Sequence, residues 1–155
     1  MSRIIKPAPI RKTIAVMAER DTAFEVFTSS MHRWWPSTHT IGEGKLAAAV
    51  LERRVGGRWY GRDEDGGETD WGYVLVWEPP ERLILAWRIN GNTFDATLHT
   101  EVEITFQALD VNITEVRLEH RFLERISAKD ARTNIDNGWT VVLEHYKRAA
   151  QRSVY

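Results

Sequence analysis

The sequence of 155 residues contains no cysteine. This absence excludes disulfide bonds, thiolate metal sites and thiol nucleophiles, and it fits a reducing compartment, so we expect a cytoplasmic protein. Long hydrophobic runs are missing too. The longest, Leu46 to Leu51, is far shorter than the ~20 apolar residues that a membrane-spanning helix needs. The first residues lack the apolar segment of a secretory signal, so we expect no signal peptide.

Neither sign of charge dominates the chain. Lys and Arg number 21 and Asp and Glu 22, which gives a net charge of −1 at pH 7. Such a balance implies no general attraction to nucleic acid or to an anionic membrane. The acidic segment Asp63–Asp70 lacks the closing glutamate of a calcium loop, so we expect an exposed hairpin tip there. The histidines are not spaced for a zinc site, and the sequence predicts neither a metal nor a cofactor.

Tryptophan, in contrast, is abundant. The chain has seven tryptophans, and 43% of its residues are hydrophobic. This composition is typical of one globular domain that buries a sizeable core. Pro7 and Pro9 predict a loose N-terminal arm over residues 1–9, which leaves residues 10–155 as a single domain.

Turn signals and apolar periodicity predict an α+β domain. A strand over Arg11–Met17 precedes a helix that begins at Asp21 or Thr22, with Thr22 and Glu25 as a capping box, and then a short helix over Met31–Trp35. Strands separated by short turns follow at residues 46–54, 58–62, 69–78, 83–90, 100–109 and 115–123, with a loop over 91–98.

The chain ends in a long amphipathic helix, for which Ser127 and Asp130 fit a capping box. One apolar stripe follows helical spacing: Ile135, Trp139, Val142, Tyr146 and Ala149. An antiparallel sheet must bury one face, and this helix is the only large apolar partner available. We therefore expect a curved antiparallel sheet wrapped around the C-terminal helix, with two short helices after the first strand.

Strand alternation indicates which side chains face this helix. In the last three long strands the predicted inward set is Leu83, Leu85, Trp87, Ile89, Val102, Ile104, Phe106, Val116, Leu118, His120 and Phe122. The strand over 69–78 is ambiguous, because Trp71, Tyr73, Leu75 and Trp77 share one face and Val74 and Val76 the other. Gly138 costs about 1 kcal/mol relative to alanine in a helix interior, which suggests close approach of the sheet or of a ligand. The aromatic residues either fill the centre or enclose a cavity, and periodicity leaves both open.

A series of short motifs resembles the activator of heat-shock-protein-90 ATPase homologue family, over roughly residues 10 to 150. In chain order these motifs are Arg33-Trp34-Trp35-Pro36, Val55-Gly56-Gly57-Arg58-Trp59, Trp71-Gly72-Tyr73-Val74, Glu78-Pro79-Pro80-Glu81-Arg82-Leu83 with Trp87, Leu118-Glu119-His120-Arg121-Phe122 and Asn137-Gly138-Trp139.

The resemblance implies a START-like (SRPBCC) helix-grip fold. Across that group, a deep apolar cavity between the sheet and the terminal helix binds lipids, sterols, polyketides and other hydrophobic molecules. We therefore expect this protein to bind a small hydrophobic molecule, without an assigned catalytic residue. The expected ligand-binding residues are Trp35, Trp71, Trp87, His120, Phe122, Gly138 and Trp139.

Two alternatives stay open. The first is an enzyme of the cyclase or hydratase type, with His120 as general acid or base in a dry cavity. The second is a protein-interaction module that acts on a chaperone partner in a stress response.

Overall fold

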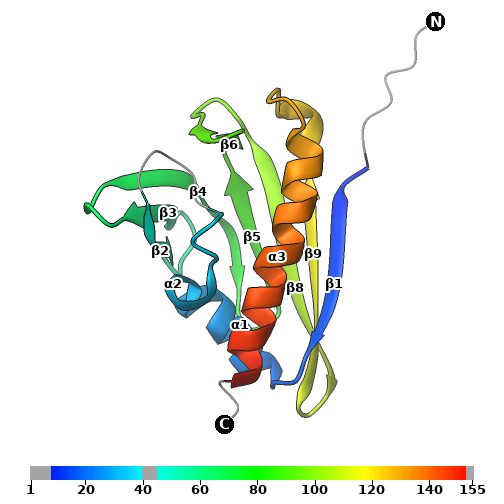
Figure 1. The fold of residues 1–155 in the computed structure, drawn as a ribbon. Coiled ribbons are helices and arrows are strands. Elements are labelled where there is room, and N and C mark those ends of the chain that lie inside the picture. The colour runs from blue at the N-terminus through cyan, green and yellow to red at the C-terminus, as the bar shows by residue number, and fades with distance from the viewer. Residues whose placement is uncertain (1–7, 40–44, 153–155) are drawn as a thin grey trace, which may run out of the picture.

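A seven-stranded antiparallel sheet curls around one long helix in the computed structural model, which describes residues 8–39 and 45–152 (Figure 1). The strand order is β1-β9-β8-β5-β4-β3-β2. The strands are β1 (Ile10–Val16), β2 (Leu46–Leu51), β3 (Arg58–Asp63), β4 (Glu68–Glu78), β5 (Arg82–Trp87), β8 (Thr100–Asp110) and β9 (Ile113–Arg121). The long helix is α3 (Ala131–Arg152), and the α+β helix-grip architecture expected from the sequence is confirmed. Most of the predicted arm, residues 1–7, lies outside the described residues.

Two short helices connect the edge strands of the sheet. The helices α1 (Arg20–Ser29) and α2 (Met31–Trp34) follow β1, one edge, and lead toward β2, the other edge. They lie at the C-terminal end of α3 (Figure 1). The buried Tyr146 hydroxyl donates a 2.7 Å hydrogen bond to the carbonyl of Ala23, and the ring of Phe27 lies 5.1 Å from that of Tyr146. These contacts fasten α1 to the helix at the centre of the fold.

Both predicted capping boxes are wrong. Helix α1 begins at Arg20 with Glu19 at the N-cap position, without a side-chain capping hydrogen bond. Helix α3 begins at Ala131, too far along the chain for Ser127 to cap it. The Ser127 hydroxyl instead accepts a 2.9 Å hydrogen bond from the Asn90 amide, which fixes the loop before α3. A serine hydroxyl has several partners within reach in a folded chain, and here a tertiary partner is preferred to the local one.

Strand β4 owes its mixed pattern to two irregularities in the sheet. Register shifts occur between Trp59 and Tyr60 of β3 opposite β4, and between Val74 and Val76 of β4 itself. A bulge moves the following side chains to the other face of the sheet. The four residues predicted to share one face are therefore split: Trp71 is fully buried, while Tyr73, Leu75 and Trp77 are partly exposed. The strand predicted over 83–90 is also divided, into β5 and β6 (Ile89–Asn90), and β6 pairs with β7 (Thr93–Phe94) in a small ribbon.

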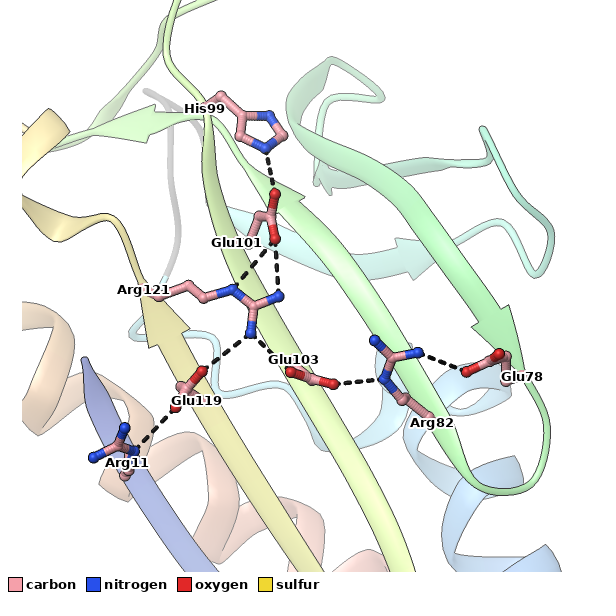
Figure 2. A network of polar contacts seen from close by, with 8 residues as sticks. All are labelled: Arg11, Glu78, Arg82, His99, Glu101, Glu103, Glu119 and Arg121. Atoms are coloured by element: carbon pink, nitrogen blue, oxygen red, sulfur yellow. Dashed lines mark hydrogen bonds and ion pairs between the residues drawn. The ribbon is translucent and has the colours of Figure 1, made fainter.

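The remaining predictions of buried faces are confirmed in β5, β8 and β9. All the predicted inward residues from Leu83 to His120 are buried. On the opposite, convex face of the sheet, ion pairs join β1, β9, β8 and β5 (Figure 2). Arg121 is central to them, because its guanidinium bonds Glu101, Glu103 and Glu119. Within the described ranges, no helix is both long and apolar enough to cross a membrane.

Candidate functional site

A cavity of about 220 Å³ lies between α3, the end of β5 and the segment after α2. Its wall is largely apolar and aromatic. The lining residues are Trp35, His39, Trp87, Gly91, Asn134, Ile135, Gly138, Trp139 and Val142. The exposed residues Gly91 and Asn134 form its rim.

Three indole rings from distant parts of the chain meet at this cavity. Trp35 follows α2, Trp87 ends β5 and Trp139 lies in α3. Their ring centroids are 6.0 Å apart for Trp35 and Trp139 and 5.6 Å apart for Trp87 and Trp139. Together with Gly138, these are the predicted site residues that the fold brings onto one cavity wall.

Trp71 supports the wall from behind. It is fully buried, and its ring lies 5.0 Å from that of Trp35. A Cβ atom on Gly61 would come within 2.7 Å of the Trp71 ring, so this glycine gives the indole room. Trp71 does not line the cavity, and its indole N–H has no hydrogen-bond partner among the described residues.

Phe122 lies apart from the cavity. Strand β9 ends at Arg121, and Phe122 adopts a left-handed backbone conformation with φ 67°. The alternation of β9, from which an inward Phe122 ring was predicted, therefore ends one residue before Phe122. The ring is partly exposed, with the guanidinium carbon of Arg125 4.3 Å from its centre.

His120 is fully buried behind the aromatic wall, and both of its ring nitrogens are bonded. Thr100 donates its hydroxyl hydrogen to the carbonyl of Trp87 over 2.9 Å, so its oxygen accepts the N–H of His120 Nε2 over 3.0 Å. The other nitrogen, Nδ1, accepts the indole N–H of Trp139 over 3.2 Å. This assigns the neutral tautomer with hydrogen on Nε2.

Burial determines the electrostatics of this histidine. Removing the ring from water disfavours its charged form and lowers the pKa of His120 to about 3. A neutral ring with two committed nitrogens connects the main chain of Trp87 to the indole of Trp139. In this arrangement His120 positions two cavity walls, and neither ring nitrogen is available to a bound molecule.

Gly138 lines the cavity beside the ring of His39. A Cβ atom built on it would meet only the ring of His39, at 3.5 Å from Cδ2 and 4.0 Å from Nε2, which is ordinary van der Waals contact. No described backbone approaches close enough to require glycine. The described sheet therefore does not explain this glycine, and close approach of a ligand stays the prediction for Gly138.

Among the residues that the structure describes, sequence reasoning missed five that line the cavity: His39, Gly91, Asn134, Ile135 and Val142. Ile135 and Val142 belong to the predicted stripe of α3 and flank Trp139 at helical spacing, so the periodicity could have identified them. His39 and Gly91 lie in turns, where neither the helical spacing nor the strand alternation predicts which residues face inward. The described residues contain no group of three or more His, Asp or Glu side chains placed to hold a metal ion.

Several solved structures are similar to this chain over nearly its whole length. Txn09, described as an anthrahydroquino-γ-pyrone synthase and solved with SUM, is 31% identical; the match covers 93% of this chain and 97% of Txn09, with a TM-score of 0.64. CalC from Micromonospora echinospora, a self-sacrificing resistance protein, is 29% identical over 94% of this chain and 96% of its own, with a TM-score of 0.71. Protein MLL2253 from Mesorhizobium loti, at 20% identity over 92% and 97% and a TM-score of 0.65, supports the fold alone.

A search among curated proteins gives no significant match. The family model described as activator of Hsp90 ATPase homolog 1-like protein matches residues 17–151. This match contains every described element from α1 to the last turn of α3, and with them all the described residues that line the cavity. The chain therefore belongs to the activator of Hsp90 ATPase homolog 1-like protein family.

Proposed function

We propose that this protein binds a small planar aromatic molecule in the cavity between α3 and the sheet. The observation that carries the proposal is Gly138, a glycine in a helix interior that faces the cavity without a packing reason. Such a glycine costs about 1 kcal/mol relative to alanine. A bound molecule that uses the space offsets this cost.

The wall suits a flat apolar ligand. Trp35, Trp87 and Trp139 offer aromatic rings for stacked or edge-to-face contacts, each worth about 0.5–1.5 kcal/mol beyond the area that they bury. The volume of about 220 Å³ also suffices. A dry engineered cavity of about 150 Å³ already binds benzene, so two fused rings fit here with part of the molecule at the rim.

The comparisons support the aromatic class. Txn09, at 31% identity, is described as an anthrahydroquino-γ-pyrone synthase, and that name denotes a polycyclic aromatic product. We infer a ligand of the same broad chemistry for this chain, either an aromatic polyketide or a smaller fused-ring compound.

Tryptophan fluorescence during a titration with naphthalene tests the proposal, with thermal unfolding as a second readout. We expect saturable quenching and a higher melting temperature, since ligand at a hundred times its Kd adds about 2.7 kcal/mol to stability. Gly138→Leu fills the space and is expected to weaken binding at least about tenfold. Gly138→Ala is the graded control: its Cβ makes only ordinary contacts with the protein, so it should keep the fold and bind more weakly than the wild type but more tightly than Gly138→Leu. Absence of quenching in the wild type, or equal binding by Gly138→Leu, would refute the proposal.

A second candidate is an enzyme that transforms its ligand in the same cavity, and the 31% identity to a synthase favours it. His120, the acid or base named for this alternative from the sequence, has both of its nitrogens bonded to protein groups. If His120 nevertheless transfers protons, His120→Gln should abolish turnover of an aromatic compound even at concentrations that saturate the variant. Full turnover in that variant would exclude a catalytic role for His120.

A further inference from the structure

We propose that His39 recognises an oxygen on the edge of the bound aromatic molecule, so that the ligand class is a hydroxylated or keto-bearing aromatic compound rather than a hydrocarbon. This inference rests on the proposed function and deepens it. It is based on the polar side-chain atoms at the cavity that have no hydrogen-bond partner among the described residues.

The three indole N–H groups of the wall are already committed to protein acceptors. Trp35 donates to the carbonyl of His39 over 2.9 Å, and Trp87 donates to the carbonyl of Ile89 over 3.1 Å. Trp139 donates to Nδ1 of His120, as described above. The tryptophans therefore offer a ligand their ring surfaces and no hydrogen bond. Among the described lining residues, His39 and Asn134 are the remaining ones with polar side chains.

Both backbone groups of His39 and one nitrogen of its ring have protein partners. Its backbone N–H donates to the carbonyl of Pro36 over 3.0 Å, and its carbonyl holds the Trp35 indole. Nδ1 of the ring lies 2.9 Å from the hydroxyl of Thr38. The residue is half-buried and lines the cavity.

Among the described residues, the second ring nitrogen, Nε2, is the one that remains for a ligand. Nε2 lies 4.0 Å from the point where a Cβ atom of Gly138 would be, so the His39 ring and Gly138 are neighbours on the cavity wall. In residues 8–39 and 45–152, no group is hydrogen-bonded to Nε2. A ligand bound in the cavity against this part of the wall therefore meets this nitrogen.

The protonation state of the His39 ring determines which oxygen groups it can bind. Partial burial, with a smaller contribution from His145, lowers the pKa of His39, so the ring is neutral at neutral pH. The Thr38 hydroxyl can donate to Nδ1 or accept from it, so Nε2 can donate to a keto oxygen or accept from a hydroxyl. A neutral imidazole recognises such oxygens without favouring an anion. Asn134 is exposed at the rim, where water competes for its amide.

A pair of probes tests this assignment: naphthalene and 2-naphthol, which differ by one hydroxyl. Affinities come from tryptophan quenching with the full-length chain. The quantity of interest is the ratio of the naphthalene Kd to the 2-naphthol Kd, because it cancels changes that affect both probes equally. We expect His39→Phe, which keeps an aromatic ring at the position, to reduce this ratio about fivefold and to retain naphthalene binding. His32→Phe, on the exposed side of α2, is the matched control and should keep the wild-type ratio.

The outcomes separate the two proposals. If the wild type binds neither probe, the proposed function fails. If both probes bind and His39→Phe keeps the wild-type ratio, the aromatic cavity stands and the role of His39 is refuted. A ratio that falls in Asn134→Leu but not in His39→Phe would assign the recognition to the rim amide and also overturn the proposal.

Discussion

Acidification should destabilise this protein through one buried histidine. The pKa of His120 is about 3 in the folded chain because of burial, against an ordinary value of 6.5. Between these two pH values, His120 is protonated in the unfolded chain and neutral in the folded chain. The free energy of unfolding therefore decreases as the pH is lowered through this range. The contribution is fully present above the ordinary value. The loss amounts to about 2 kcal/mol between about pH 7.5 and about pH 5, a large part of the ~5–15 kcal/mol that stabilises a typical domain.

Urea unfolding followed by far-UV circular dichroism measures this loss. The pH should stay above about 5, because Glu101 and Glu103 also have lowered pKa values: burial raises them, but hydrogen bonds from His99, Arg121 and Arg82 outweigh it. Those carboxylates lose their contribution only at lower pH.

Two variants isolate the histidine. His120→Gln offers a donor and an acceptor without titrating, so it should be less stable at neutral pH but should lose most of the pH dependence. His39→Gln corrects for His39, whose lowered pKa acts in the same direction, and it should keep most of the dependence. The reasoning is refuted if His120→Gln shows the same pH dependence as the wild type.

Three further substitutions test the supporting structure. Gly72→Ala should cost at least about 3 kcal/mol in urea unfolding, because its Cβ would lie 1.7 Å from the carbonyl oxygen of Ala86; a stable variant would contradict this. Thr100→Val keeps the side-chain volume but removes the group between the buried histidine and the Trp87 carbonyl, so we expect a loss of about 1–3 kcal/mol; a loss below about 0.5 kcal/mol would show that this bond is unimportant. Arg121→Met should lose about 1 kcal/mol at low ionic strength and less in high salt, because its ion pairs are partly exposed; a loss independent of salt would indicate packing instead.

The architecture could be predicted because its strong patterns are local and periodic. The alternating residues around Ile104 and Leu118 match the buried face of the sheet, and the stripe of α3 matches the side that packs against it. The bulges of β4 could not be predicted. A bulge inserts one unpaired residue, and the side chains after it then point to the opposite face of the sheet. The amino-acid composition of the strand does not show where such a residue lies. The capping residue Ser127 failed for a related reason, since the tertiary partner Asn90 was invisible from the local sequence.

The candidate site was predictable to a lesser degree. Large aromatic residues and a helical glycine are recognisable in a sequence, and four of the residues named from them line one cavity. An inward-facing residue can line a cavity or lie behind its wall, depending on how far its side chain is from the cavity. Strand alternation gives the face of the sheet but not this distance. Trp71 and His120 point inward as expected and lie behind the wall. His39 lies in a turn with no period, and only the folded geometry brings it to Gly138.

The three indole rings of the wall come from residues 35, 87 and 139, and the edge strand β1 pairs with β9 across most of the chain, with Ile10 opposite His120. The cavity therefore has no local precursor: it forms only when the N-terminal segment has closed against the sheet and the terminal helix. Contacts this distant in sequence make folding slow, because the chain must be ordered before they contribute. A molecule held in the cavity consequently stabilises the domain as a unit, and it should slow hydrogen exchange in the core strands as much as near the ligand.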